Sequence, residues 1–445
     1  MKAQKQKMSI IKKMLIAVVA GFAVGILCLF IKGQISSDVW DVVDAIFFQD
    51  ITATKSIEGI GIFYIIGQLF MHGLQMMIVP LVLCSLSLAL CSLADPKKLG
   101  KIAGKTFICY ICFYVVAAAL AGAAAYFVKS MGWFDVNLPA KEAQKLVTMD
   151  GYNPLVTVVN AVPSNIVSSL SSNSTILSVV VVAIVLGLCM TALGEKAQPL
   201  KRVIEVLNDI VQMALNFIIN KVAPIAIFCM IARAFAVYGT EYISPTLVWI
   251  ATTIIVSLLL VVTIYPIGVF ITTGLNPITF LKKTAKIGMF AAATNSSAAT
   301  LPLNTKTCRE ELGCSKEISS FVLPTGMTIN MNGTTAMHMI AITFIGTAAG
   351  INVTPATLAL TAFLSICTAI GTPAVPVAGT TMVYVVMMGL GFNTELCLIG
   401  YSLVLAMNYL PGMAVITLNV VGDAATNVIV NAKEKRLNKE VYDKK

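Results

Sequence analysis

The stretch Gly326-Met327-Thr328-Ile329-Asn330-Met331-Asn332-Gly333-Thr334 decides the fold. It sets helix-breaking and amide residues in the middle of a segment, about 314–346, that otherwise has the apolar composition of a membrane-spanning helix. Hydrocarbon cannot hydrogen-bond an exposed backbone, so a broken helix at membrane depth is tolerated only where it lines a cavity or is buried in protein. In transporters such breaks coordinate ions and substrate, and the stretch therefore favours a membrane transporter.

The composition of the whole chain leaves little room for a soluble protein. Of its 445 residues, 58% are hydrophobic and 12% are charged, whereas a soluble domain carries about 25% charged residues. The net charge of +10 comes from short basic clusters between apolar runs. We interpret these clusters as charges that set membrane topology, and nucleic acid is not an expected partner. The eleven cysteines lie mostly inside apolar runs without paired spacings, so we expect them to be reduced and buried.

The positive clusters predict the membrane topology. Residues 1–13 carry lysines and no acidic residue, and no signal-peptide-like cleavage site follows the apolar run after them. We therefore expect a retained first helix with both termini in the cytoplasm. The expected spans are about 10–32, 58–93, 103–130, 175–193, 203–237, 245–274, 314–346 and 395–431.

Two further apolar segments are expected to be re-entrant hairpins. The first, about 276–305, begins and ends at basic clusters and so on the cytoplasmic side, and the second, about 354–392, is expected to begin and end outside. Their tips, 294–302 and 371–379, are rich in hydroxyl, amide, Gly and Pro residues, which suit half-helix ends that point at a polar ligand. A hairpin followed by a helix thus occurs twice with opposite orientation, which indicates inverted repeats with a site between the two tips.

Four motifs in order carry a resemblance to a known family: Thr294 to Pro302, Asn330-Met-Asn-Gly-Thr334, Gly371 to Gly379, and Asn419-Val-Val-Gly-Asp423. On this hydropathy profile the chain resembles, over essentially its full length, the glutamate transporter homologues, the dicarboxylate/amino acid:cation symporters. The resemblance implies an all-α polytopic membrane protein with eight transmembrane helices, two re-entrant helical hairpins and inverted repeats. It also implies an elevator-type homotrimer in the lipid bilayer of the cell (plasma) membrane, which moves a small-molecule solute.

The resemblance also divides the chain into a scaffold and a transport domain. Residues 1–101 would form scaffold helices 1 and 2, and 102–131 would form helix 3 of the transport domain. Residues 132–240 would form an extracellular loop and scaffold helices 4 and 5. Residues 241–433 would form the transport-domain core, and 434–445 a cytoplasmic tail, which its basic sequence predicts to be solvated.

Two cation sites of the family can be placed on this sequence. The resemblance implies that the first uses backbone carbonyls at Gly326, Asn330 and Asn419 with the carboxylate of Asp423, and all four identities are retained. Asp423 is also the one acid near the middle of the last span, where a carboxylate needs a partner, either a cation or neighbouring amides. The second site would use carbonyls around four positions: Thr328, Ala369, Ile370 and Thr372.

A third cation site of the family is expected to be lost. The resemblance requires an Asp where this chain has Asn332, and two hydroxyl groups where our alignment places Phe113 and Tyr114; Tyr110 matches the family's Tyr. An amide supplies no negative charge to a hard cation, and Phe113 supplies no ligand.

The substrate site departs further from the family pattern. Members that carry acidic amino acids use an Arg where this chain has Val415, and an Asp where it has Gly412 for the amino group. Some bacterial members instead carry an Arg at the position of Asn295. Val cannot replace a bidentate Arg without loss of recognition of a second carboxylate. Pro411 also predicts a kink in the last helix.

The expected solute is therefore a neutral amino acid or a monocarboxylate. Ser297 with hairpin amides and Asn419 would hold one carboxylate, and an apolar body would face Val415 and Ile416. The residues implied to bind the substrate are Asn295, Ser296, Ser297, Thr334, Val375, Pro376, Ala378, Gly379, Gly412, Val415, Ile416 and Asn419. A dicarboxylate or acidic amino acid bound by a rearranged site is the alternative.

Sodium, protons or both are the expected coupling ions, with no other cofactor. His338 lies where proton-coupled relatives carry a Glu, and His titrates near neutral pH; the alternative is a neutral, hydrogen-bonded His between packed helices. The two histidines, His72 and His338, lie far apart and no HExxH-like pattern occurs, so the chain is not expected to be an enzyme. An anion channel or a ligand sensor built like a transporter remains the other reading.

Overall fold

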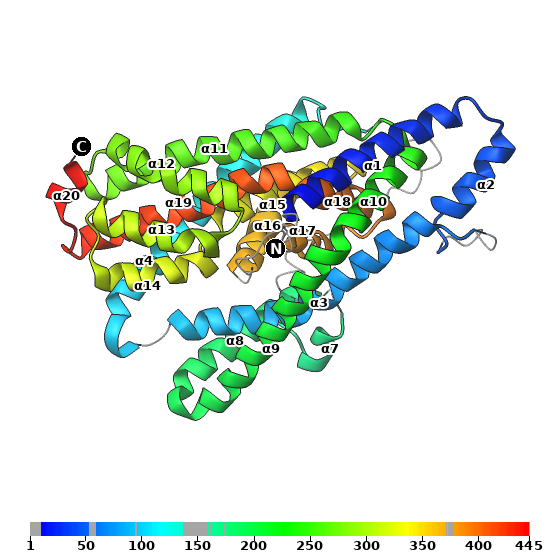
Figure 1. Cartoon of the computed structure of the whole chain (residues 1–445). Coiled ribbons are helices and arrows are strands. Elements are labelled where there is room, and N and C mark those ends of the chain that lie inside the picture. The colour runs from blue at the N-terminus through cyan, green and yellow to red at the C-terminus, as the bar shows by residue number, and fades with distance from the viewer. Residues whose placement is uncertain are drawn as a thin grey trace, which may run out of the picture.

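The computed structural model describes residues 10–52, 59–93, 96–136, 159, 162–172, 175–370, 372 and 378–444. Within these ranges all regular structure is helical (Figure 1). Five stretches are long and apolar enough to cross a membrane by length and composition: Ile62–Leu88, Gly100–Ser130, Ser178–Val237, Ile243–Thr273 and Tyr409–Lys433. The all-helical class expected from the sequence is confirmed at this level.

The first four helices follow the expected spans, with one addition. They are α1 (Ile10–Lys32), α2 (Ser37–Phe47), α3 (Ile62–Leu93) and α4 (Pro96–Ser130). The expected spans leave residues 33–57 as a connection between the first two helices, and α2 lies within this connection. Trp40 on α2 is buried and stacks on Phe48, with ring centroids 6.2 Å apart, so this short helix is held by an aromatic cluster.

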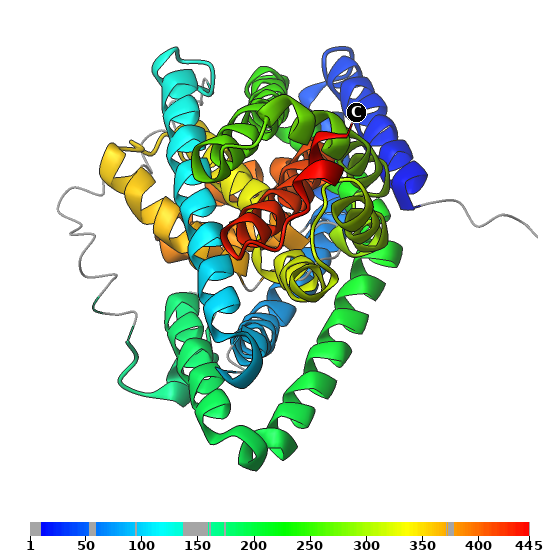
Figure 2. The same ribbon diagram turned by 90° about the vertical axis from the view of Figure 1, so that its left-hand side faces the viewer.

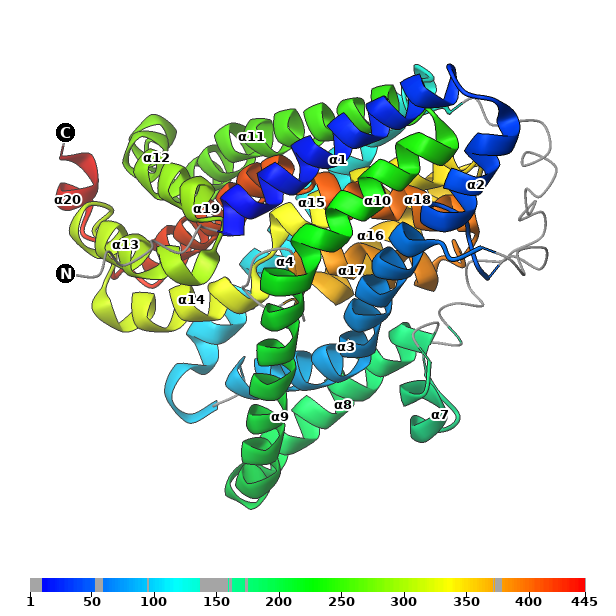
Figure 3. The same cartoon turned by 45° about the vertical axis from the view of Figure 1, so that its right-hand side comes forward.

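The expected span 203–237 is a composite. The middle of the chain forms α7 (Ile166–Leu170), α8 (Ile176–Leu193), the 3-10 turn η2 (Gly194–Ala197), α9 (Gln198–Phe217), the π-helical turn η3 (Ile218–Val222) and α10 (Ala223–Tyr238). Pro224 in the first turn of α10 has no N–H to donate to the carbonyl of Asn220, which explains a change of helix type there. Figure 3 shows α9 and α10 continuing as one long column.

Helices α1 and α10 pack along one another through small residues. A Cβ atom added at Gly25 would lie 2.6 Å from the Cβ of Phe235, and one at Gly21 would lie 3.0 Å from that of Ile231. Only glycine permits so close an approach of two helices, which is the usual device of helix packing in membranes.

The second half of the chain surrounds two central helices. It forms α11 (Ile243–Thr273), α12 (Pro277–Thr294), α13 (Ser297–Glu310), α14 (Lys316–Ile329), α15 (Asn332–Ala348), α16 (Pro355–Ile370), α17 (Ala378–Gly389), α18 (Glu395–Met407), α19 (Tyr409–Lys433) and α20 (Lys439–Asp443). Nearly all residues of α15 and most residues of α19 are buried. Helices α4, α11, α12 and α14 pack around this pair. Polar residues on α15 and α19 therefore lie in protein and not in lipid.

The last expected span, 395–431, is broken into α18 and α19 at Asn408. The sequence predicted one span with a kink at Pro411. The break comes earlier because Pro411 sits in the first turn of α19, where its missing N–H has no helical partner in any case. The N–H of Gly412 donates to the carbonyl of Asn408 over 2.7 Å and closes that first turn.

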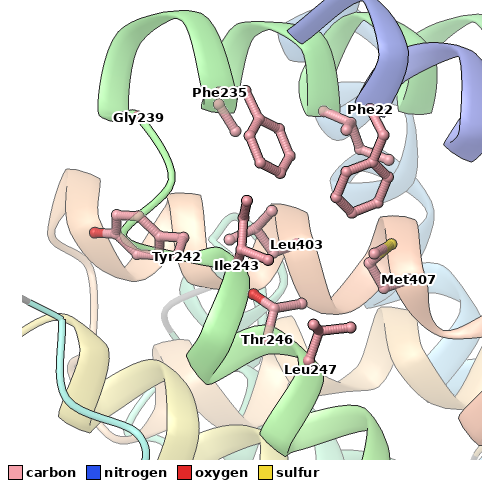
Figure 4. A pocket seen from close by; sticks show the side chains of 11 residues that line it. Phe22, Phe235, Gly239, Tyr242, Ile243, Thr246, Leu247, Leu403 and Met407 are labelled. Atoms are coloured by element: carbon pink, nitrogen blue, oxygen red, sulfur yellow. The ribbon is translucent and has the colours of Figure 1, made fainter. Parts of the chain in front are cut away.

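A small apolar cavity lies where α1 and α10 meet α11 and α18 (Figure 4). Phe22 and Phe235 approach it from one side, and Leu247, Leu403 and Met407 from the other. Its lining is almost wholly apolar. The contact between the helices predicted as scaffold and those predicted as transport domain therefore rests here on side-chain packing.

The C-terminal tail is folded onto the protein, which corrects the prediction of a solvated tail. Tyr442 on α20 is fully buried and its hydroxyl donates to the carbonyl of Asn276 over 2.9 Å. The ammonium of Lys283 on α12 donates to the carbonyls of Val441 and Tyr442 over 3.0 and 2.7 Å. Figure 2 looks onto the end of the molecule where this helix lies. The prediction of a solvated tail rested on its basic composition and took no account of Tyr442, the aromatic residue that anchors the tail.

All eleven cysteines lie in the described ranges as free thiols. Cys112 and Cys189 are exposed, whereas the sequence predicted burial. Both lie on helices that present an apolar side to the surroundings of the protein, so apolar composition did not imply burial within it.

Candidate functional site

The break in the deciding stretch lies between α14 and α15, at Asn330 and Met331. Its two freed backbone groups are satisfied by one side chain from α4. The buried hydroxyl of Tyr114 donates to the carbonyl of Ile329 and accepts from the N–H of Met331, the latter over 2.7 Å. The discontinuity predicted at Asn330 is confirmed, and it is built into the packing of α4 against α15.

The carboxylate of Asp423 on α19 faces the end of α14. Asp423 is 3% exposed, and its Oδ1 accepts a hydrogen bond of 2.9 Å from the Nδ2 of Asn330. A side chain at Gly326 would collide with this carboxylate and would lie 2.6 Å from the hydroxyl of Tyr110. Across the described ranges, no Lys or Arg forms an ion pair with Asp423. The result is a buried acid whose hydrogen-bond donor is a neutral amide.

Gly326, Asn330 and Asn419, which the resemblance assigns to the first cation site, lie close to this carboxylate. The carbonyl of Gly326 accepts from the N–H of Asn330 over 2.8 Å, in the last α-helical bond of α14. The carbonyl of Asn419 accepts from the Nδ2 of Asn330 over 3.4 Å. The structure therefore brings together all four residues predicted for this site, although they are up to 97 positions apart in sequence.

Asn332 lies in an amide and phenol chain behind Asp423. Its Nδ2 donates to Oδ1 of Asn330 over 2.8 Å and to the hydroxyl of Tyr265 over 3.0 Å. Tyr265 in turn donates to the carbonyl of Leu418 over 2.9 Å. The Oδ1 of Asn332 is buried and receives no hydrogen bond from any described residue. Asn332 thus offers an acceptor oxygen without a hydrogen-bond donor in the described ranges. It lacks the negative charge of the Asp that the resemblance implies at this position.

Phe113 and Tyr114, which align with the hydroxyl positions of the third site, make structural contacts in this protein. Phe113 packs edge-on against the ring of Tyr265, with centroids 5.0 Å apart, and Tyr114 is used by the helix break. Neither geometry offers a free oxygen to a cation. The loss of the third site stays a prediction, and these two contacts support it.

The end of α16 meets the break from another side. Ala369 and Ile370 pack with Tyr114 and Met331. The N–H of Thr372 donates to the carbonyl of Ala369 over 3.0 Å, so the chain turns at this point. Helices α14 and α16 both end here, and the last carbonyls of a helix lack intrahelical donors and carry partial negative charge. Thr328 lies one residue from the end of α14, with its hydroxyl bonded to the carbonyl of Thr325 over 3.0 Å.

Asn419 ties α19 to the first turn of α15. Its Oδ1 accepts from the N–H of Gly333 over 2.7 Å, and its Nδ2 donates to the Sδ of Met331 over 3.3 Å and to the hydroxyl of Thr334 over 3.5 Å. A side chain at Gly333 would collide with the carbonyl of Val415. The two central helices therefore cross at backbone contact beside the predicted substrate residues.

The tip between α12 and α13 is short and ordered by its own side chains. Asn295 adopts the left-handed conformation, with φ of 48°, that ends α12. The hydroxyl of Ser296 accepts from the N–H of Ala299 over 3.2 Å and caps α13. Ser297 is buried, and its hydroxyl has no partner among the described residues. Of the three residues, Ser296 has a structural role and Ser297 has free hydrogen-bonding capacity.

Two buried amides meet at Gly412. A Cβ atom there would lie 3.3 Å from the Nδ2 of Asn295 and 3.3 Å from the Nδ2 of Asn408. Asn408 is 6% exposed, and its Oδ1 finds no partner in the described part of the chain. Asn408 was not among the residues predicted from the sequence, because its place beside Asn295 arises only when the helices pack. Tyr265 was also missed, and nothing in its local sequence marked it.

None of the chain's arginines takes over the missing role. Arg202 and Arg233 lie on α9 and α10, Arg309 lies in the last turn of α13, and Arg436 follows α19 and pairs with Glu317. The region around Gly412 and Val415 thus has amide groups in place of the guanidinium that the resemblance requires.

His338 on α15 links the central pair to α17. It is fully buried, and its Nε2 lies 2.8 Å from the carbonyl of Gly379. A carbonyl can only accept, so Nε2 carries the hydrogen and Nδ1 is the free acceptor of the neutral ring. A Cβ at Gly379 would lie 3.0 Å from the Cγ2 of Thr334, so the start of α17 rests on this helix. Ala378 is the first residue of α17, while Val375 and Pro376 lie outside the described residues.

Val415 and Ile416 lie on α19 near the candidate site, with Val415 buried and Ile416 half-buried. Both side chains are apolar and neither can bind an ionised group. In the described ranges no group of three or more His, Cys, Asp or Glu residues could hold a metal ion, so the donor set consists of carbonyls, amides and one carboxylate. Such oxygen-rich sets suit hard cations.

Known proteins resemble this chain over most of its length. The family described as the Sodium:dicarboxylate symporter family matches residues 10–433. The chain is 27% identical over 380 residues to a proton/sodium-glutamate symport protein of Bacillus caldotenax, which covers 84% of this chain and 88% of that protein. It is 28% identical to a C4-dicarboxylate transport protein of Paraburkholderia phymatum, covering 84% of this chain and 87% of that protein. It is 26% identical to an excitatory amino acid transporter of Caenorhabditis elegans, covering 80% and 78%.

These relatives are transporters and not enzymes. The family match includes the broken helix, its partner α19 and the buried Asp423. Since it extends over nearly the whole chain, the protein belongs to the sodium:dicarboxylate symporter family.

Proposed function

We propose that this protein is a secondary active transporter that couples the movement of a neutral amino acid or a monocarboxylate to sodium, protons or both. The observation that carries the proposal is the buried carboxylate of Asp423, whose hydrogen-bond donor is the Asn330 amide. A carboxylate excluded from water and without a cationic side chain is costly, and a transported cation provides the missing charge.

The first cation site consists of Asp423 with the carbonyls of Gly326, Asn330 and Asn419. The Asn330 amide that now reaches Asp423 neutralises none of its charge, whereas a sodium ion would do so directly. Carbonyls of Thr328, Ala369, Ile370 and Thr372 form the second site, and the two converging helix ends support it by their partial charge. Asn332 leaves the third site without its acid.

The absence of a guanidinium near Gly412 supports the solute class. A substrate with two carboxylates would bury one of them among Asn295, Asn408 and Val415, without a positive charge. One carboxylate can be held by Ser297 and Asn419, and the paired amides at Gly412 suit an uncharged polar group. Relatives are named for glutamate and C4-dicarboxylates, so a dicarboxylate held by a rearranged amide site is the second candidate.

A thermal-shift screen separates the two solute classes. Neutral amino acids, monocarboxylates and dicarboxylates would each be added with sodium, with potassium or at low pH, because a ligand stabilises the folded state by its binding free energy. We expect a neutral or singly charged solute to raise the unfolding temperature in sodium. Stabilisation by aspartate, glutamate or succinate alone would favour the second candidate.

Uptake into proteoliposomes tests coupling itself. A labelled solute found in the screen should accumulate against its gradient, and removal of the sodium or proton gradient should collapse that accumulation. Downhill flux of the solute that is insensitive to both gradients would show that the protein is a channel and not a coupled transporter.

The proposal extends to assembly and orientation. The apolar face of α9 is exposed at helical spacing, which suits packing against further copies in a homotrimer; its residues are Leu200, Val203, Leu207, Ile210 and Phe217. Native mass spectrometry should give the trimer mass, and Ile210→Lys should reduce it to the monomer, while Ile271→Lys on α11 should not. Both termini would lie in the cytoplasm of a cell whose plasma membrane holds the protein.

A further inference from the structure

A large groove opens on the outside of the helices that carry the candidate site. It lies between α4, α11 and α19, and its volume is about 620 Å³, within the range of roughly 300–1,000 Å³ that small ligands occupy. From Lys105 at one end it reaches Leu120 at the other, so it follows α4 for about four turns. Ile267 and Ile271 on α11 flank it and are more than half exposed.

The wall of the groove offers no polar anchor along its length. Its two threonine hydroxyls are already bonded to their own helix: Thr263 donates to the carbonyl of Leu259 and Thr272 to that of Gly268, both over 2.6 Å. The thiol of Cys109 points to the hydroxyl of Thr426 at 3.5 Å. A polar solute would lose its hydration in this groove without compensation, whereas a hydrocarbon chain would lose none.

One end of the groove is basic. Lys105 lies there and pairs with Glu434 at 2.5 Å, and Lys433 lies beside it, exposed and with no ion pair among the described residues. An apolar groove that ends at a net positive charge is complementary to an amphiphile with an apolar chain and an anionic head. Basic pockets between membrane helices bind such lipid headgroups.

The groove also shares a wall with the candidate site. The ring of Phe113 lines it and rests against Gly268, where a Cβ would lie 2.9 Å from the ring. The same ring also contacts Tyr265, one turn earlier on α11, which bonds Asn332. An occupant of the groove would therefore press on helices that hold the cation site.

We propose that this groove binds one anionic phospholipid, with an acyl chain along α4 and the phosphate between Lys105 and Lys433. The bound lipid holds α4, α11 and α19 together. This site is separate from the solute site and does not depend on the identity of the solute.

The proposal is tested with the full-length protein in detergent micelles that contain either phosphatidylglycerol or phosphatidylcholine. We expect phosphatidylglycerol to raise the unfolding temperature and to slow alkylation of Cys112, an exposed thiol in the groove, as followed by peptide mapping. Equal effects of the two lipids would overturn the proposal, because the basic end would then select nothing.

Two pairs of variants locate the effect. Val116→Trp fills the groove and should abolish the phosphatidylglycerol effect, while Val115→Trp, on the next residue but outside the lining, should keep it. Lys433→Gln should weaken the apparent affinity for phosphatidylglycerol roughly fivefold, the contribution of one basic residue near an anionic surface, and Lys282→Gln on α12 should not. Exposed Lys433 can change without disturbing the fold, so persistence of full affinity in Lys433→Gln would refute the site even if Val116→Trp failed to fold.

Discussion

At Asp423 the carboxylate has lost nearly all contact with water and receives a hydrogen bond from the neutral amide of Asn330. Removing one partner of a buried charge costs about 3–5 kcal/mol. We therefore expect the charge at this residue to be sensitive to the binding of a cation.

We predict that Asp423→Asn abolishes coupled uptake. The amide keeps the shape of the carboxylate but removes its charge, so the affinity for sodium should fall by more than about 100-fold. The cation-free variant should be at least as stable as the parent, because a buried unpaired charge is gone. Uptake into proteoliposomes and the sodium dependence of the unfolding temperature measure both effects, with exposed Asp209→Asn as the control. Full coupled uptake by the variant would remove Asp423 from the cation site.

The second residue-scale prediction concerns His338. Its Nε2–H donates to Gly379, and a glutamine at this position can supply the same donor but cannot titrate. If His338 carries the transported proton, His338→Gln should retain binding of the solute and lose the pH dependence of uptake between about pH 5 and 8. His72→Gln, which changes an exposed histidine on α3, is the control. An unchanged pH profile in His338→Gln would leave His338 as a structural hydrogen-bond donor.

At the scale of single residues, the sequence predicted those site residues that belong to one of the four motifs. Asp423 and Asn330 were placed together because the family resemblance, carried by four motifs, implies a shared cation site for them. Asn408 and Tyr265 were not, because their roles arise only when α18, α12 and α11 are packed, and single-sequence reading has no access to that packing. The free hydroxyl of Ser297 and the capping hydroxyl of Ser296 are likewise indistinguishable in sequence.

Among the elements, the crossing of α15 and α19 is the most constrained. The backbone of Val415 touches Gly333, and a backbone carbonyl cannot move aside as a side chain can. Overpacking of this kind costs roughly 1–3 kcal/mol or more.

We therefore predict that Gly333→Ala lowers the unfolding temperature and impairs uptake. The matched control is Gly104→Ala on α4, where a new Cβ meets nothing within 4 Å. In that open helical position alanine should stabilise the protein by up to about 1 kcal/mol. Thermal unfolding in detergent distinguishes the opposite signs. Equal behaviour of the two variants would show that the crossing relaxes.

Element positions were predictable where composition and length were sufficient. The spans of α1, α3, α4, α8 and α11 follow directly from apolar runs bounded by charges or turns. The helix α2, the π-helical turn before Pro224 and the folding of α20 onto α12 were not predicted. Each depends on a long-range contact or on one proline within an apolar run, and such features do not alter the average hydropathy of a segment.

For the whole molecule, the proposed elevator movement requires α11 and α18 to slide past α1 and α10. The apolar cavity of Figure 4 lies on this boundary, lined by Phe22 and Phe235 on one side and Met407 on the other. A contact without directional bonds offers little resistance to such sliding.

We predict that a covalent link across this boundary stops transport. In a background without native cysteines, Phe22→Cys with Met407→Cys, joined by a short bifunctional thiol reagent, should lose uptake and regain it when the link is cleaved. The control pair, Phe22→Cys with Phe235→Cys, joins α1 to α10, where the two native rings already lie 4.9 Å apart. Its cross-linked form should retain uptake. Undiminished uptake with the first link in place would argue against relative movement of these helices.

The hydroxyl of Tyr114 has a consequence for the speed of ion exchange. It bonds both the carbonyl of Ile329 and the N–H of Met331, so these two backbone groups of the unwound turn have a protein partner and need no ion to satisfy them. An ion that binds at the proposed site would find these two backbone groups already hydrogen-bonded, so its main costs would be its own dehydration and the displacement of the Asn330 amide from Asp423. Tyr114 pre-organises the proposed site without being one of its proposed ligands. The rate at which the ion binds should therefore be governed by access to the site and not by local refolding.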